Sequence, residues 1–492
     1  METKKLIDQA IKKSYDYLGK DKFLHARIIS SQIIKIDSNC HDAHMVLGLC
    51  CLKDQNVEKA KEFFLKCLEC ETLKESAYNN LSICYSKIKK HHDSINCIWN
   101  CLSLNSTKDY YWSHLAMQYK ELNYFSKADE CFVKALDLNP SAINLSNYAA
   151  FLGDTGDYKK ATFYFEKSLK KDPIFFGPYI DLFHVYALNN RYSHKLWEYY
   201  EKRFDVYSQL KWVKEKNLKS PKNILECKNK KCVIYCEQGI GDGLMFMRYL
   251  KLMPSYVKYV ISCEPEMKSI FEKLNVKVIT SLKNKKFDFY ISLLSLPFLL
   301  KKPSIPKPFF PITSKIKKFN NKIGICWSGS PAHAFDKHRS IYFKKFYEIF
   351  KNKNNLEIFS LVKNYSCRKY VESNEVIDLS SGALEEDGLI NIGNHMKDVE
   401  STAKIILEKK ISLVITVDTM MAHLALSMGI ETWLLLSKKS DWRWGLKNKS
   451  KWYENNLKIF RQTKLDEWDD VLNKVEECLN KHSSTKKLKI RT

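Results

Sequence analysis

The sequence contains little glycine and proline, with 15 and 12 residues of each among 492. This scarcity excludes collagen-like and low-complexity architectures. No uncharged apolar run approaches the roughly 20 residues that a membrane-spanning helix needs. Residues 1–20 alternate charged and apolar side chains and lack the apolar core of a signal peptide. These absences predict a soluble, cytoplasmic protein.

Cysteine is present but arranged neither as a disulfide scaffold nor as a metal site. The 16 cysteines are spaced irregularly, and Cys67 and Cys70 form the only C-x-x-C pair. No second pair and no His-x-x-x-His completes a zinc site. Buried thiols in a reducing compartment explain the cysteines better, and we expect no bound metal.

Charge of one sign dominates. Lysine and arginine number 81 and aspartate and glutamate 56, so the net charge is +25. The excess favours anionic partners, but lysine recurs throughout the chain and no nucleic-acid-binding motif is present. We therefore expect no specific nucleic-acid partner, and a solvated lysine-rich surface remains an alternative. The basic tail at residues 481–492 is either disordered or in weak contact with an anionic membrane surface.

The first 200 residues repeat with a period near 34. Small residues mark the period: Ala26, Ala60, Ser94, Ala128 and Ala161. Small side chains at one helical position let two helices pack closely, and Pro140 and Pro173 end helices. The pattern resembles the tetratricopeptide repeat. It predicts five stacked helix pairs over about residues 5–175, with Cys67 and Cys101 as packing residues. A capping helix pair at 179–207 completes a repeat domain, residues 1–208, for protein or peptide partners.

The second half alternates short apolar strands with helices, which predicts two parallel, doubly wound sheets. Expected strands are residues 232–236, 259–263, 276–280, 287–292, 323–328, 356–361, 413–417 and 431–436. We assign a lysine- and asparagine-rich linker to 209–231 and Rossmann-like lobes to 232–311 and 312–480. Ligands of such sheets bind at the carboxyl ends of the strands.

Three motifs fall at those strand ends. They are EQGIGD at residues 237–242, IGICWSGSP at 323–331, and VDTMMAHLA at 417–425, followed by DWRW at 441–444. In this order they resemble a heptosyltransferase-like domain of glycosyltransferase family nine, which follows tetratricopeptide repeats in some bacterial proteins. The architecture is also similar to that of the O-GlcNAc transferases.

The resemblance implies a GT-B fold and an inverting, metal-independent hexosyl- or heptosyltransferase. Asp242 matches the aspartate proposed as general base, which takes the proton of the acceptor hydroxyl. The alternative is that Asp242 only caps the following helix. Gly239 and Gly241 would let the backbone approach a substrate. No cofactor is implied, because the nucleotide-diphosphate sugar is a co-substrate.

Donor binding is expected at Asp418 and Thr419, which open a helix after a buried strand. A helix N-terminus suits a diphosphate, so the Thr419 hydroxyl and the amides of Met420 and Met421 would contact phosphate oxygens. Asp418 would face sugar hydroxyls. His423 lies on the same helix face as Thr419 and would reach the sugar or phosphate. Its alternative is an ordinary helix histidine.

The second motif supplies the remaining donor residues. Ser328 and Gly329 end a strand beside the same site, and Arg339 would stabilise the leaving diphosphate in place of a metal. Arg339 paired with Asp336 on the surface is the alternative. Three tryptophans are expected to pack rather than to hold a sugar: Trp442, Trp444 and Trp452. Three positions depart from the family pattern: Ser330, Leu426 and Ser437.

Two functions follow as hypotheses. In the first, the lobes transfer a sugar from the donor to a protein or glycan acceptor that the repeats recruit. In the second, the chain is an interaction scaffold whose transferase-like domain is inactive.

Overall fold

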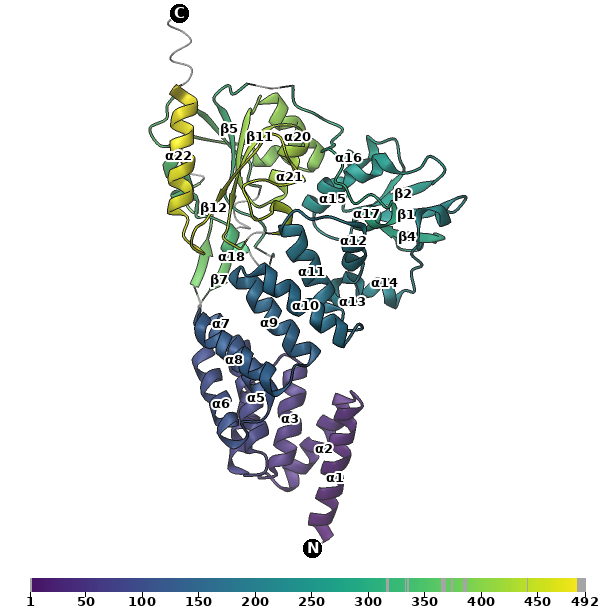
Figure 1. Cartoon of the computed structure of the whole chain (residues 1–492), viewed down its shortest axis with the longest axis vertical. Coiled ribbons are helices and arrows are strands. Elements are labelled where there is room, and N and C mark those ends of the chain that lie inside the picture. The colour runs from purple at the N-terminus through teal and green to yellow at the C-terminus, as the bar shows by residue number, and fades with distance from the viewer. Residues whose placement is uncertain are drawn as a thin grey trace, which may run out of the picture. The chain divides into compact units, whose positions relative to one another are not determined.

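The computed structural model describes residues 2–315, 318–331, 333, 336–363, 369–372, 375–383, 386, 388–439 and 441–484. The chain forms two compact units, Met1–Pro178 and Tyr179–Thr492 (Figure 1). The division falls earlier than the expected boundary at residue 208. No helix of the described residues is long and apolar enough to cross a membrane.

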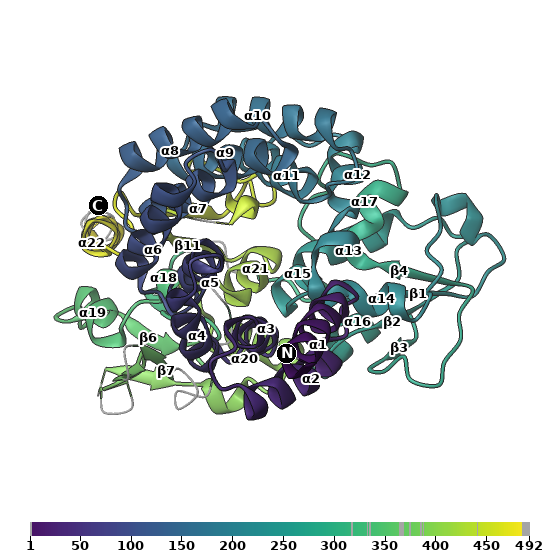
Figure 2. The ribbon, with the colours of Figure 1, turned by 90° about the horizontal axis from the view of Figure 1, so that it is seen from below.

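The first unit is a series of antiparallel helix pairs, as the 34-residue period predicts. The helices are α1 (Glu2–Gly19), α2 (Phe23–Ile36), α3 (His41–Lys53), α4 (Val57–Lys66), α5 (Lys74–Lys87), α6 (His91–Leu104), α7 (Asp109–Glu121), α8 (Phe125–Leu138), α9 (Ala142–Thr155) and α10 (Tyr158–Lys171). Figure 2 shows them following one another along a curved path. The five small residues of the period are fully buried, and so are Cys67 and Cys101, which confirms their packing role.

The turn inside each helix pair has its own periodic signature. One residue of each turn adopts a positive φ: Asp21, Gln55, Lys89, Asn123 and Gly156. Left-handed backbone is easiest for glycine and tolerable for asparagine. Only Gly156 and Asn123 are therefore recognisable from sequence, and the other turns depend on the packing of the helices they join.

The second unit begins with helices in the segment that was expected to cap the repeats, and the last of them lies in the expected linker. They are α11 (Gly177–Leu188), α12 (His194–Glu201), α13 (Arg203–Val206) and α14 (Lys211–Glu215). Phe183, Trp197 and Tyr200 belong to the same hydrophobic core as the sheets. Val213 packs with Val233 and Tyr235 of the first sheet. Residues 209–231 are thus not a free linker, because their apolar side chains cover the sheet.

Two parallel sheets follow, as predicted. The first has the order β3-β2-β1-β4, and the second the order β12-β11-β10-β5-β6-β9. Their strands are β1 (Cys232–Tyr235), β2 (Tyr259–Ser262), β3 (Val278–Ile279), β4 (Phe289–Ser292), β5 (Lys322–Cys326), β6 (Glu357–Ser360), β9 (Leu389–Asn391), β10 (Leu413–Val417), β11 (Glu431–Leu436) and β12 (Leu457–Arg461).

Sequence reasoning missed the outer strands and the last helix. β9 and β12 lie at the two edges of the second sheet, and both carry polar, partly exposed residues. The C-terminal helix α22 (Asp469–Ser484) and the antiparallel hairpin of β7 (Lys369–Glu372) and β8 (Glu375–Asp378) were also unforeseen. Edge strands lack the continuous apolar run that identifies a buried parallel strand. The basic tail from residue 485 onward lies outside the described residues.

Candidate functional site

The first and third motifs meet in the second unit. Helix α15 (Ile240–Phe246) follows β1, and helix α21 (Met420–Ser427) follows β10. The two helices pack against each other. A Cβ atom built on Gly241 would lie 2.9 Å from Cδ2 of His423 and 3.6 Å from Cα of Met420. Two segments that are far apart in the chain therefore meet at the ends of strands from different sheets.

This contact changes the interpretation of the glycine turn. Gly241 is small because α21 lies directly against it, and this packing explains the glycine without a substrate. Gly239 differs, since nothing lies within 4 Å of a Cβ built there. Gly239 is exposed at the N-cap of α15 and remains available to a ligand.

Replacing Gly241 with alanine should destabilise the second unit by about 1–3 kcal/mol, because the added methyl group presses on the His423 ring. Gly239→Ser is the matched control, since serine is favourable at an N-cap and its side chain meets open space. Chemical denaturation followed by tryptophan fluorescence measures both. Equal stability of the two variants would contradict this close packing.

Asp242 occupies the first turn of α15. Gly239 is the N-cap, and the Asp242 side chain makes no capping hydrogen bond, so the alternative role as a cap is wrong. Its carboxylate instead forms an ion pair with the guanidinium of Arg443. Burial raises the pKa of Asp242, and Arg443 opposes that rise. Two opposing effects thus act on the pKa of this carboxylate, namely its desolvation and the positive charge of Arg443.

Arg443 is the central residue that sequence reasoning did not single out. Besides Asp242, its Nη1 donates to Oδ1 of Asp441 at 2.7 Å, and its Nη2 lies 3.4 Å from Oε1 of Gln238. The side chain is only 11% exposed. The sequence signal that could have identified Arg443 is its position within the DWRW motif. Arg443 links the second sheet's loop to the first sheet's glycine turn.

Asp418 and Thr419 follow β10, as expected, but part of their bonding capacity is already used. Thr419 is the N-cap of α21, and its Oγ1 accepts a hydrogen bond from the Met421 amide at 3.3 Å. This bond uses the proton of the Met421 amide, which was expected to contact a phosphate oxygen. Met420 is half-buried. Burial and the neighbouring Asp441 carboxylate raise the pKa of Asp418 to about 6.

His423 is packed inside the unit rather than presented to a ligand. It is 5% exposed, its Nδ1 lies 3.1 Å from the Tyr453 hydroxyl, and its ring stacks on Trp444 at 4.8 Å. Burial lowers its pKa to about 3, so the imidazole is neutral. These contacts agree with the alternative interpretation that His423 is an ordinary helix residue that packs inside the unit. The tryptophans at 442, 444 and 452 are buried, which confirms that they pack.

The second motif joins the same site through Arg339. The guanidinium pairs with Asp336 through Nε and Oδ1 at 3.0 Å, and Nη1 donates to the Asp418 carbonyl at 2.9 Å. Arg339 is 18% exposed, so it pairs with Asp336 without being an ordinary surface residue. The Gly329 amide donates to Ser340 Oγ at 3.0 Å. Ser328 is buried, and its hydroxyl has no hydrogen-bond partner among the described residues.

Arg203 is a buried arginine that binds Glu237, the first residue of the EQGIGD turn. Arg203 Nε binds Glu237 Oε1 at 2.6 Å, and both side chains are 0% exposed. Arg203 also binds Glu201 at 2.7 Å, and it donates to Ser292 Oγ at 3.2 Å and Ser295 Oγ at 2.8 Å. Sequence reasoning missed this residue, because it lies in a segment assigned to the repeats. It fixes the start of the EQGIGD turn.

The arrangement gathers carboxylates and guanidinium groups at the strand ends of both sheets. Asp242 and Asp441 form ion pairs with Arg443. Asp418 lies near enough for Asp441, Arg339 and Arg443 to shift its pKa, and Arg339 binds its backbone carbonyl. Such a set can accept a proton and bind an anion. In the part of the chain that the structure describes, no group of three His, Cys, Asp or Glu residues could hold a metal ion.

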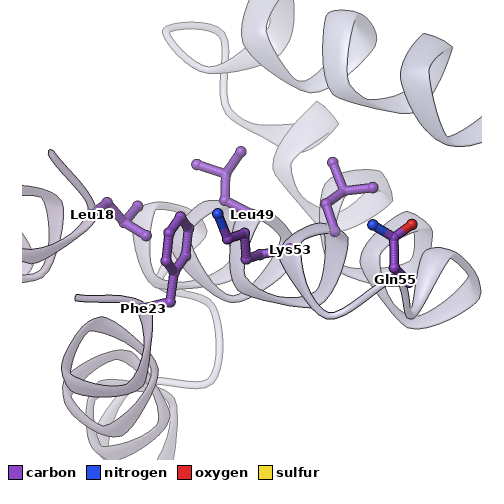
Figure 3. A pocket seen from close by; sticks show the side chains of 6 residues that line it. Leu18, Phe23, Leu49, Lys53 and Gln55 are labelled. Carbon is purple, nitrogen blue, oxygen red and sulfur yellow. The ribbon is translucent and has the colours of Figure 1, made fainter. Parts of the chain in front are cut away.

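A separate pocket of about 440 Å³ lies in the first unit (Figure 3). Leu18, Phe23, Leu49 and Leu52 form its apolar wall, and Lys53 lies over the Phe23 ring at 4.9 Å. None of the three motifs contributes to it. The pocket therefore belongs to the repeats and not to the polar site of the second unit.

Comparison with known proteins supports the interpretation of the first unit. The tetratricopeptide repeat model matches residues 41–70 and 110–141, which correspond to α3–α4 and α7–α8. The chain thus contains tetratricopeptide repeats, a class of repeat that implies protein partners. A search of curated proteins gave no match.

Solved structures similar to the chain cover about a third of it or somewhat more. The crystal structure of MamA is 20% identical, with 32% of this chain and 94% of that chain covered and a TM-score of 0.30. A thermophilic tetratricopeptide repeat protein of Thermus thermophilus is 15% identical (36% and 98%; TM-score 0.33). PilF of Pseudomonas aeruginosa is 16% identical (44% and 99%; TM-score 0.35).

Proposed function

We propose that the second unit is a glycosyltransferase that moves a sugar from a nucleotide-diphosphate donor to an acceptor bound by the repeats. The observation that carries this proposal is the ion pair of Asp242 with Arg443 beside the packed helices α15 and α21, the second of which directly follows Asp418 and Thr419. These residues come from the carboxyl ends of strands in two parallel sheets, where ligands of such sheets bind. The motif resemblance to family-nine transferases, and with it the GT-B fold, supports the same proposal.

In the proposed reaction, Asp242 accepts the proton of the acceptor hydroxyl while the hydroxyl oxygen attacks the anomeric carbon. The bond from that carbon to the diphosphate breaks on the opposite face, and the configuration inverts. Arg339 and Arg443 supply positive charge for the leaving diphosphate. In the structure, Arg443 forms ion pairs with Asp242 and Asp441. If the Arg443 side chain moved to bind the diphosphate of the donor, the Asp242 carboxylate would be released to act as a base.

Donor binding provides the first test. Full-length protein is heated with UDP, GDP, ADP or CDP and with matching nucleotide sugars. A donor at about 100 times its dissociation constant stabilises the folded state by roughly 2.7 kcal/mol, or about 5–10 °C in melting temperature. We expect a shift with nucleotides of one base. The absence of a shift with all of them would contradict the proposal.

The second candidate function is a protein-interaction scaffold with an inactive transferase-like unit. The repeats favour it, since tetratricopeptide repeats imply protein partners. The ion pair that engages Asp242 also favours it. Failure of every nucleotide in the thermal-shift panel, together with capture of a protein by the chain, would establish this scaffold function.

Donor affinity should depend on pH through Asp418. Because its pKa is raised to about 6, the carboxylate is ionised above that pH and accepts hydrogen bonds from sugar hydroxyls. The affinity for the nucleotide sugar should therefore rise as the pH increases from 5 to 7, by about 10-fold for one charge-assisted bond. Calorimetric titrations of wild type and Asp418→Asn, which should lose the rise, check this.

A further inference from the structure

The positive charge of the chain is distributed unevenly. Residues 1–178 contain 25 lysines and arginines against 22 aspartates and glutamates. Residues 209–311, which build the first sheet and its surroundings, contain 20 against 8. The excess is therefore concentrated in the second unit, instead of being spread evenly over a lysine-rich surface.

Much of this charge lies at one edge of the first sheet. Strands β1 to β4 are parallel, so their amino ends all lie along the same edge (Figure 2). The segments that enter these strands carry eight exposed lysines, which we call the basic edge: Lys228, Lys230, Lys231, Lys258, Lys277, Lys283, Lys285 and Lys286. The polar site described above lies at the carboxyl ends, so the basic edge is a different surface.

The lysines of the basic edge lack ion-pair partners in the part of the chain that the structure describes. Among the described residues, no ion pair engages any of its eight ammonium groups. The segments contain two acidic residues. The Glu226 carboxylate accepts a hydrogen bond from the Lys222 backbone amide at 3.0 Å, and the Asp288 carboxylate accepts one from the Lys231 backbone amide at 2.7 Å. Eight like charges in proximity repel one another, so an anionic partner would be attracted strongly.

We propose that the basic edge docks the protein on an anionic lipid surface. Neighbouring strands are about 4.8 Å apart, so four strand ends spread the lysines over roughly 15 Å or more. Lysine is a flexible point charge that suits a diffuse negative surface, whereas arginine provides the planar fork that suits specific phosphates. Leu225, 68% exposed in the segment that enters β1, adds an apolar side chain for the interface.

Single-stranded nucleic acid fits this surface less well, because its binding sites combine positive charge with exposed aromatic platforms. The large apolar side chains that residues 209–311 expose, in the part the structure describes, are Leu225 and Leu252. Neither is aromatic. The surface therefore has the charge of a nucleic-acid site without its stacking groups.

Sedimentation of the full chain with lipid vesicles tests the proposal. We expect binding to vesicles of phosphatidylcholine and phosphatidylglycerol in equal parts, no binding to phosphatidylcholine alone, and release by salt. The combined variant Lys283→Gln, Lys285→Gln and Lys286→Gln should lower the partition coefficient about 100-fold. These side chains are exposed, so the melting temperature should not change.

A matched control neutralises three exposed lysines of the first unit, Lys12→Gln, Lys13→Gln and Lys134→Gln, and should bind vesicles like the wild type. Removal of residues 485–492 separates the basic edge from the tail and should also leave binding intact. Equal binding to both vesicle types, equal losses in the two triple variants, or loss on removal of the tail would overturn the proposal. Tighter binding of a random oligonucleotide at the same salt, abolished by the first variant, would also overturn it.

Discussion

Replacing Asp242 with asparagine should lower kcat for glycosyl transfer by about 10²–10⁴-fold, the range that general-base catalysis contributes. The amide cannot take the proton of the acceptor hydroxyl, although it has nearly the same shape and still offers an oxygen to Arg443. Donor affinity should not fall, because the amide holds Arg443 more weakly than the carboxylate does. The measurement is release of nucleoside diphosphate at saturating donor and acceptor, combined with a calorimetric titration of the donor.

Asp441→Asn is the decisive control for that variant. Asp441 binds the same guanidinium as Asp242, with its Oδ1 2.7 Å from Nη1 of Arg443, but no base role is assigned to it. If Asp242 acts as the base, Asp441→Asn should retain most of the turnover. Equal losses in the two variants would instead assign the effect to the charge balance around Arg443, and unchanged turnover in Asp242→Asn would refute the base.

Local patterns explain why the array and the central strands could be predicted. Residues such as Ala60 and Ala128 recur in fixed register, and each is buried for the same reason in each helix pair. Strands β1, β10 and β11 are almost wholly buried, so they appear as short apolar runs. Both signals lie within a few residues of the element they predict.

The site depended on contacts that no local pattern encodes. Arg443 and Asp242 are 201 residues apart, and Arg203 and Glu237 join a helix after the repeats to the glycine turn. Gly241 and His423 were singled out for contacts with a substrate or donor, whereas in the structure each is explained by packing against the other. A motif identifies residues under constraint, and only the fold distinguishes a ligand contact from a helix contact.

The buried Arg203–Glu237 pair should dominate the stability of the second unit. Both side chains are 0% exposed, so Arg203→Met leaves the Glu237 carboxylate buried without its partner. Removal of one member of such a pair costs about 3–5 kcal/mol. Glu237→Gln should cost less, because Arg203 keeps Glu201, Ser292 and Ser295 as partners. Urea denaturation followed by tryptophan fluorescence reports chiefly this unit, which holds eight of the ten tryptophans.

The double variant Arg203→Met, Glu237→Gln separates the pair's interaction from the loss of either side chain alone. If the cost of Arg203→Met comes from the unpaired carboxylate, the second substitution removes that charge and should restore part of the stability. Additive losses would show that Arg203 acts through Glu201 and the two serines instead. Glu237 begins the turn that ends at Asp242. The variant Arg203→Met should therefore also reduce turnover at temperatures where the protein remains folded. Turnover unchanged under those conditions would mean that α15 alone positions Asp242.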